Sequence, residues 1–351
     1  MEAVGQIAQE SVADKIFFGS LIVLMIIGRI FMGCELDLRL VKNTLKRPVA
    51  PIIGLCSQFF VMPLLAFMFA RLLLYDQQPY IQFGLFVMGC VPGGDASNFW
   101  TYLLGANVNL SVTMTFISTI FSLFMTTMWI KLLGPYLVVT ESGGVAKEIV
   151  MNIPYKGLLG SLFLLSIPIV IGIFIARYRP SLAERARKCL RPLIYFIVLF
   201  TFSFGALLYH RIFFQEITFK SLMAGFLLPF FGFYIGCLAA YMLGQPMENI
   251  VAISIETGVQ NLPIALAVLK LSFPEWHADE RLLQPVLVGA FTPLPIILCY
   301  ILQQSFSHFV KSSTVSQMEE VKSSMQVVVQ KSQPQGKELR NVGWRECEHA
   351  S

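Results

Sequence analysis

The sequence predicts an all-α protein that crosses a membrane nine times. Of its 351 residues, 56% are hydrophobic and 13% are charged, whereas a soluble domain carries about 25% charged residues. The apolar residues form runs of the length needed to span a bilayer, which is roughly 20 residues. Two of these runs, in corresponding positions of the two halves, are interrupted by polar residues and helix breakers.

The runs follow one another with mostly short connections, which favours one compact bundle. They are predicted at 15–34, 48–74, 80–104, 108–134, 156–177, 192–210, 221–243, 249–271 and 282–304. Residues 1–14 form a short leading segment, in which no basic residue marks a cleavable signal peptide. Residues 305–351 are rich in Ser, Gln, Lys and Glu and predict a disordered tail.

The distribution of Lys and Arg predicts the orientation. Sixteen of them lie in the connections after the first and fifth runs and in the tail, against nine towards the other side. This places residues 1–14 outside the cell and residues 305–351 in the cytoplasm. Arg29 lies inside the first run and is left out of the count; we expect its long side chain to snorkel to the basic side. The net charge of +5 comes from these connections and implies no nucleic-acid partner.

The two interrupted runs carry the polar groups that stand out. ETGVQN (256–261) lies at the centre of an apolar run, with a glycine and a following proline that predict a broken helix. PGGDASN (92–98) interrupts the third run in the same way. Two broken segments in corresponding halves are the best sequence indication of a secondary transporter's binding site. The orientation makes runs two to four antiparallel to runs seven to nine, as an inverted repeat requires.

Further polar side chains could converge on these breaks. Gln58 lies in the second run, and Ser111, Thr115 and Ser118 share one face of the fourth. With the polar residues of the two breaks they offer carboxylate, carboxamide and hydroxyl oxygens, the ligands of a small hard cation. The runs that carry these polar side chains contain no His, and the seven Cys are scattered, so a transition metal is not expected.

Sodium fits better than a proton relay, because a relay tends to use a chain of carboxylates or His. In these spans Asp95 is the one carboxylate besides Glu256. Simpler interpretations remain open. The Ser and Thr side chains could bond back along their own helix, and Gln58 could tie two helices together.

At these residues the chain resembles the bile acid:sodium symporter family (solute carrier family 10). The resemblance covers residues 15–304 and is carried by QFFVMP (58–63), GCVPGGDASNFWTYLLGANVNLSVTMT (89–115) and ETGVQN (256–261). It implies a core domain with two broken, crossing helices (about 48–134 and 221–304) and a panel domain (about 15–34 and 156–210).

The resemblance also implies two sodium sites. The first comprises Ser97, Asn98, Ser111, Thr115 and Glu256; the second comprises Gln58, Glu256, Gln260 and carbonyls near Thr257 and Val259. Asp95 and Asn261 are expected near the groove for the cargo. Asp95 departs from the neutral residue that family members carry, and its charge would disfavour an anion there or demand a cation.

The expected function is therefore sodium-coupled symport of a small amphipathic organic anion, such as a bile acid or steroid sulfate, by alternating access in the plasma membrane. No enzymatic activity and no cofactor other than the coupling ions are expected, and the oligomeric state stays open. The alternatives are a family member with another cargo or a non-transporting regulatory role. An intramembrane aspartyl protease, suggested by Asp76 and Asp95, and a receptor fit the motifs less well.

Overall fold

The computed structural model describes residues 12–46, 48–94, 96–138, 155–272 and 280–305. Within these ranges the chain is helical apart from turns, the two breaks and one isolated β-bridge. It divides into two compact units, residues 1–298 and 299–351. The sites described below lie in the first unit; the described part of the second, residues 299–305, is helical.

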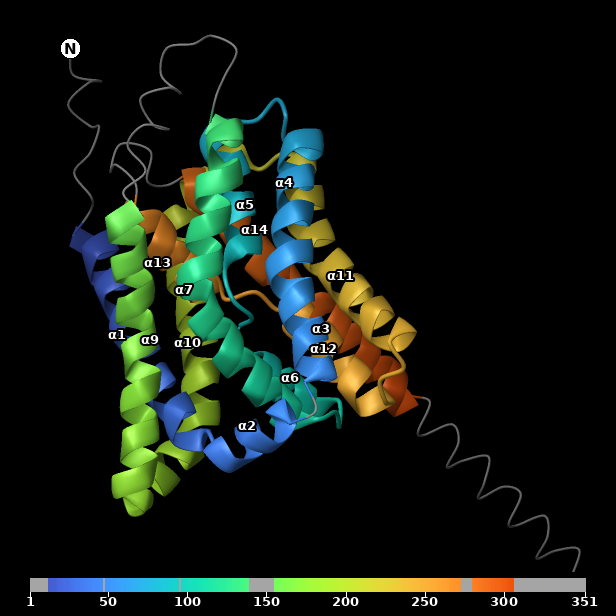
Figure 1. Ribbon diagram of the computed structural model, residues 1–351. Coiled ribbons are helices and arrows are strands. Elements are labelled where there is room, and N and C mark those ends of the chain that lie inside the picture. Colours follow the sequence, from blue (N-terminus) through green and yellow to red (C-terminus); the bar gives the residue numbers. More distant parts are fainter. Residues whose placement is uncertain (1–11, 47, 95, 139–154, 273–279, 306–351) are drawn as a thin grey trace, which may run out of the picture. The chain divides into compact units, whose positions relative to one another are not determined.

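Each run expected to span the membrane contains helix (Figure 1). The elements are α1 (Val12–Glu35), α2 (Leu38–Leu45), α3 (Val49–Cys56), the π-helix η2 (Ser57–Val61), α4 (Met62–Leu73), α5 (Pro79–Cys90), α6 (Ser97–Leu103), α7 (Val108–Val138), α9 (Tyr155–Tyr178), α10 (Pro180–Glu216), α11 (Phe219–Met242), α12 (Met247–Gly258), α13 (Leu262–Ser272), the 3₁₀ turn η4 (Glu280–Leu282) and α14 (Leu283–Phe291). Residues 293–305 are helical as well.

The described residues contain four helical stretches long and apolar enough to cross a bilayer. They are Val49–Leu73, Val108–Leu137, Phe219–Met242 and Leu283–Ser305. Two shorter apolar helices, Pro79–Cys90 and Ser166–Tyr178, add to them. The chain is thus an all-helical, multi-pass membrane protein; the number of nine spans stays a prediction.

Two helical segments were not expected from the apolar pattern. α2 is a short helix in the connection after the first run, where Asp37 caps its start by accepting a hydrogen bond from the Arg39 amide at 2.8 Å. α10 begins at Pro180, well before the expected run at 192–210. Both segments are amphipathic and rich in Lys and Arg, so a search for apolar runs passes over them.

Helices α1, α9 and α10 pack against one another and form one group (Figure 1). The crossing of α1 and α9 depends on two glycines. A Cβ atom added to Gly33 would lie 2.2 Å from the carbonyl oxygen of Ile169, and one added to Gly172 would lie 2.1 Å from that of Ile30. Small residues let membrane helices approach this closely.

The second run is interrupted by the π-helix η2 between α3 and α4. A π-turn loosens the helical hydrogen-bond ladder, and such turns are frequent at functional sites. The indole of Trp129 on α7 donates a hydrogen bond to the carbonyl of Phe59, whose partner in an α-helix would be the N–H that Pro63 lacks. The same turn carries Gln58, one of the expected site residues.

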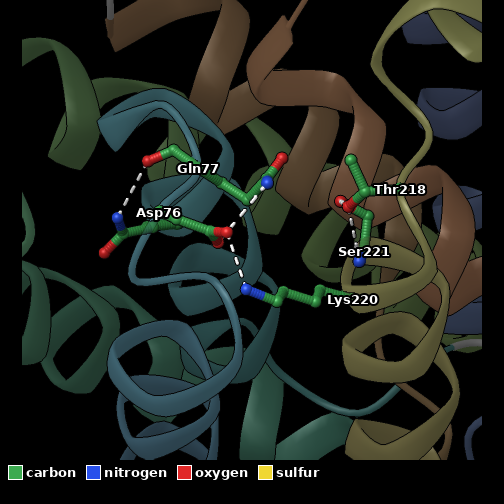
Figure 2. A network of polar contacts seen from close by, with 6 residues as sticks. Asp76, Gln77, Thr218, Lys220 and Ser221 are labelled. Atoms are coloured by element: carbon green, nitrogen blue, oxygen red, sulfur yellow. Dashed lines mark hydrogen bonds and ion pairs between the residues drawn. The ribbon is translucent and has the colours of Figure 1, made fainter.

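The turn between α4 and α5 is tied to the start of α11 (Figure 2). The Lys220 ammonium donates a hydrogen bond to Asp76 Oδ2 at 2.6 Å and lies 4.5 Å from the ring centroid of Tyr75. That hydrogen bond lowers the pKa of Asp76 below its ordinary value. The stabilisation is therefore present above the ordinary carboxyl pKa and is lost as the pH falls through the lowered one.

Candidate ion site at the crossing of two broken helices

The two breaks lie directly against each other. Helix α5 ends at Cys90 and α6 starts at Ser97, while α12 ends at Gly258 and α13 starts at Leu262, so both interruptions are confirmed. Gly93 and Gln260 pair as an antiparallel β-bridge.

Backbone hydrogen bonds join the two breaks. The amide of Gly94 donates to the carbonyl of Val259 at 2.8 Å, and that of Asn261 donates to the carbonyl of Pro92 at 3.1 Å. Each break thus satisfies backbone groups of the other, which a bilayer interior requires.

Glycine at position 93 makes room for the carboxylate of the second break. A Cβ atom there would lie 2.3 Å from Oε1 and 2.9 Å from Cδ of Glu256. A Cβ on Gly94 would lie 2.8 Å from the carbonyl oxygen of Gln260. The paired glycines are therefore required by the close approach of the second break, not by a turn with positive φ.

Glu256 is the centre of a buried hydrogen-bond cluster. Its side chain is 1% exposed, and its Oε2 accepts hydrogen bonds from the hydroxyls of Ser97 at 2.7 Å and Thr115 at 2.9 Å. Glu256 makes further contacts as well. Three helices, α6, α7 and α12, thus meet at one carboxylate.

The remaining members of the first expected set join the same cluster. Asn98 Oδ1 accepts from the hydroxyl of Ser111 at 2.9 Å and from that of Thr115 at 3.4 Å. Thr101, which the sequence reasoning missed, donates to the Ser111 hydroxyl at 3.2 Å and is fully buried. Its place four residues after Ser97 on α6 is the signal that could have found it.

The second expected set is also brought together. Gln58 Nε2 donates to Gln260 Oε1 and to the carbonyl of Val91, both at 2.8 Å. Gln260 Nε2 donates to the carbonyl of Thr257 at 2.8 Å. The carbonyl of Val259 accepts from Gly94, as described above. Gln58 therefore ties two helices together, the simpler role left open above, and does so at the break itself.

Other sequence expectations have different outcomes. Ser118 donates to the carbonyl of Thr115 at 3.0 Å along its own helix. Asn261 Oδ1 accepts from the amide of Ile264 at 3.2 Å and so caps the start of α13. Asp95, expected near the groove, lies outside the described residues, as do residues 1–11 and 306–351.

The expectation that Arg29 snorkels to the membrane surface is wrong. Its side chain is 1% exposed and Nη1 lies 3.4 Å from Thr119 Oγ1 on α7. The apolar run predicted how deep Arg29 lies in the membrane. Whether its side of the helix faces lipid or another helix depends on packing, which the sequence does not specify.

The donor set defines what the site can hold. It combines one carboxylate with hydroxyl, carboxamide and carbonyl oxygens, which suits a small hard cation. Within the described ranges, no three His, Cys, Asp or Glu side chains gather as a metal-binding group. The fold and the site thus define a multi-pass helical membrane protein with an oxygen-lined site where two broken helices cross.

Comparison with known proteins identifies the family. Residues 21–216 match the sodium bile acid symporter family, and the chain belongs to it. The match includes the first break and ends before the second. The family is named for symport of sodium and bile acid, which is transport and not catalysis.

Three relatives show how far the similarity extends. The chain is 30% identical over 273 residues to the mouse P3 protein, covering 77% of this chain and 54% of that protein. It is 27% identical to the human sodium-dependent organic anion transporter, covering 80% and 71%. It is 29% identical to the rabbit ileal sodium/bile acid cotransporter, covering 72% and 70%. The chain spans about half the length of the P3 proteins that it matches.

Proposed function

We propose that this protein is a sodium-coupled symporter of small amphipathic organic anions. The observation that carries the proposal is the buried Glu256 carboxylate. It accepts hydrogen bonds from hydroxyl groups of two other helices, at the crossing of the breaks. A carboxylate at that depth is costly unless it is compensated, and ionisable groups there mark ion and substrate paths. Sodium would supply the compensating charge.

Two sodium ions would use the two sets of oxygens. The first would bind to Ser97, Asn98, Ser111, Thr115 and Glu256, and the second to Glu256, Gln58, Gln260 and the carbonyls of Thr257 and Val259. In the structure these groups hydrogen-bond to one another. Hydroxyls and amides can rotate their oxygens towards an ion with little backbone movement, which supports a site that fills and empties in each cycle.

Alternating access would follow from movement between two groups of helices. In this proposal α1, α9 and α10 form the panel, and the helices around the two breaks form the core. The cargo would lie between them, next to the crossing. Sodium can drive its transport only if ions and cargo favour the same conformations, because a ligand with equal affinity for both states shifts nothing. The chain would cross the plasma membrane nine times, with its N-terminus outside.

The relatives support the class of cargo. Two of them are named for sodium-dependent transport of organic anions or bile acids, whereas the name of the P3 proteins says nothing of cargo. A family member with a different cargo, or with a regulatory role, is therefore the alternative.

Uptake into cells tests the proposal. Labelled taurocholate and a steroid sulfate are offered to cells that express the protein, in sodium medium and in choline medium. We expect uptake in the sodium medium and none in the choline medium. Glu256→Ala should abolish it while surface expression, measured by biotinylation, is kept. Gln77→Ala, an exposed-turn variant outside the site, should transport normally.

Two results would count against the proposal. Uptake by Glu256→Ala with normal sodium dependence would remove Glu256 from the ion site. Absence of uptake of either anion by wild-type protein at the cell surface would favour another cargo or the regulatory alternative.

A further inference from the structure

Arg29 is a buried charge for which ion binding alone gives no role. It lies on α1, inside the first predicted membrane run, and is 1% exposed. Among the described residues, the other buried charged side chains are Glu256 and Arg281. Arginine keeps its positive charge in proteins. An intramembrane charge of this kind is costly and marks a function.

Its position connects the two groups of helices beside the ion site. Arg29 is on α1, and its Nη1 lies 3.4 Å from the hydroxyl of Thr119 on α7. Thr119 is one helical turn from Thr115, whose carbonyl it contacts at 2.8 Å. The Thr115 hydroxyl in turn donates to Glu256 at 2.9 Å. Arg29 has further contacts, so the inference uses its charge, burial and place and not this one hydrogen bond.

We propose that Arg29 recognises the negative group of the cargo and couples cargo binding to sodium. This inference rests on the proposed function. A guanidinium binds a carboxylate, sulfate or sulfonate through paired hydrogen bonds, which gives geometric selectivity for such groups. A residue on α1 beside a hydroxyl of α7 would meet a cargo that lies between the two groups of helices.

Charge balance supplies the coupling. Without sodium, the buried charges of Glu256 and Arg29 oppose each other in sign. Sodium neutralises Glu256 and adds positive charge near Arg29. The guanidinium and the sodium ion then repel each other. An anion at Arg29 relieves that repulsion, so sodium strengthens anion binding. The anion must strengthen sodium binding by the same factor, because such coupling is reciprocal.

Three variants separate the effects of charge and shape. Arg29→Gln should bind sodium more tightly than wild type in the absence of cargo, on the order of tenfold, because a nearby like charge is removed. In this variant, cargo should no longer strengthen sodium binding. Arg29→Lys keeps the charge and should keep the sodium affinity, but loses the paired geometry and should bind cargo more weakly. Arg281→Gln, the loss of another buried arginine, should leave sodium affinity and coupling unchanged.

The measurement is binding of radioactive sodium to the full-length protein in lipid nanodiscs, with choline keeping the ionic strength constant. It is made alone, with taurocholate, with a steroid sulfate, and with the uncharged parent steroid. The sulfate should strengthen sodium binding to wild type and the parent steroid should not. Thermal unfolding of each variant verifies that it is folded.

The outcomes decide the proposal. Equal sodium affinity and equal coupling in Arg29→Gln and wild type would overturn it. So would a return to wild-type behaviour when Asp95→Asn is added to Arg29→Gln, since the guanidinium would then serve that carboxylate. If Arg29→Gln does not fold, Arg29→Lys decides, with cargo affinity read from the sulfate concentration that strengthens sodium binding. Unchanged cargo affinity overturns the proposal, and weakened cargo affinity at unchanged sodium affinity supports it. Wild-type protein whose sodium binding responds to neither anion would instead refute the proposed cargo class.

Discussion

At Gly93, the lack of a side chain allows a carboxylate to face the break. The Cβ of an alanine would lie 2.3 Å from Glu256 Oε1, a distance that real contacts do not reach, so the carboxylate must move. Gly93→Ala should therefore lower sodium-dependent uptake by on the order of tenfold or more, because hydrogen bonds to a charged group are lost. Uptake is measured at equal surface expression.

Gly19→Ala is the matched control for this change. It is the same substitution on α1, and no atom lies within 4 Å of the added Cβ. It should transport like wild type. Normal uptake and normal sodium affinity in Gly93→Ala would show that the carboxylate does not need its present position.

Individual site residues were predictable where a polar side chain interrupts an apolar run. Glu256 and Gln58 stand out in this way, and the structure brings both to the crossing. Thr101 was missed, although its place four residues after Ser97 puts it on the same face of α6. Arg29 was found but misinterpreted, since the direction of a side chain on a helix follows from tertiary packing.

At the scale of elements, proline and glycine made the two breaks predictable. Both the Pro92 and the Gly258 interruptions fall where expected. The π-turn at Ser57–Val61 was not predicted, although Pro63 follows it and lacks the N–H that would donate to the Phe59 carbonyl in an α-helix. The start of α10 was missed because its first turns are rich in charged residues, and the prediction searched for apolar runs.

The crossing of α1 and α9 gives a prediction about stability. Gly33→Ala would place its Cβ 2.2 Å from the carbonyl oxygen of Ile169, so the two helices must separate. Overpacking of this kind costs about 1 to 3 kcal/mol. We expect a lower thermal unfolding temperature for the purified protein in detergent.

The control lies on the same helix. The Cβ of Gly28→Ala would meet Ile197 Cδ1 at 3.5 Å, which is ordinary contact, so its unfolding temperature should stay near that of wild type. Equal unfolding temperatures for the Gly33 and Gly28 variants would mean that the crossing is loose enough to absorb a methyl group.

At the scale of the whole molecule, the two breaks matter because they are far apart in sequence and adjacent in space. Gly93 and Gln260 form a β-bridge across 167 positions. The family match covers residues 21–216 and therefore includes the first break only. What links the second break to the first is their contact in the structure. The resemblance to the family implied both the crossing of the two broken helices and a group formed by 15–34 and 156–210. The structure brings the two breaks together and packs α1, α9 and α10 against one another.

Alternating access predicts that contacts between the two groups of helices break during transport. Phe99 on α6, next to Asn98, packs against Tyr195 on α10 with ring centroids 5.1 Å apart. Cysteines at these two positions, joined by a short reducible bifunctional reagent, should block uptake, and dithiothreitol should restore it. The background would replace the exposed cysteines and Cys347 with serine; the exposed ones are Cys56, Cys189, Cys237 and Cys299.

A second pair within one group of helices is the control. Phe17 on α1 and Phe200 on α10 stack with centroids 5.5 Å apart. Cysteines there should be joined without loss of uptake, because both helices belong to the group formed by α1, α9 and α10. Single-cysteine variants treated with the reagent account for its chemical effect. Full uptake by protein joined between positions 99 and 195 would mean that α6 and α10 keep their contact throughout the cycle, and that the moving boundary lies elsewhere.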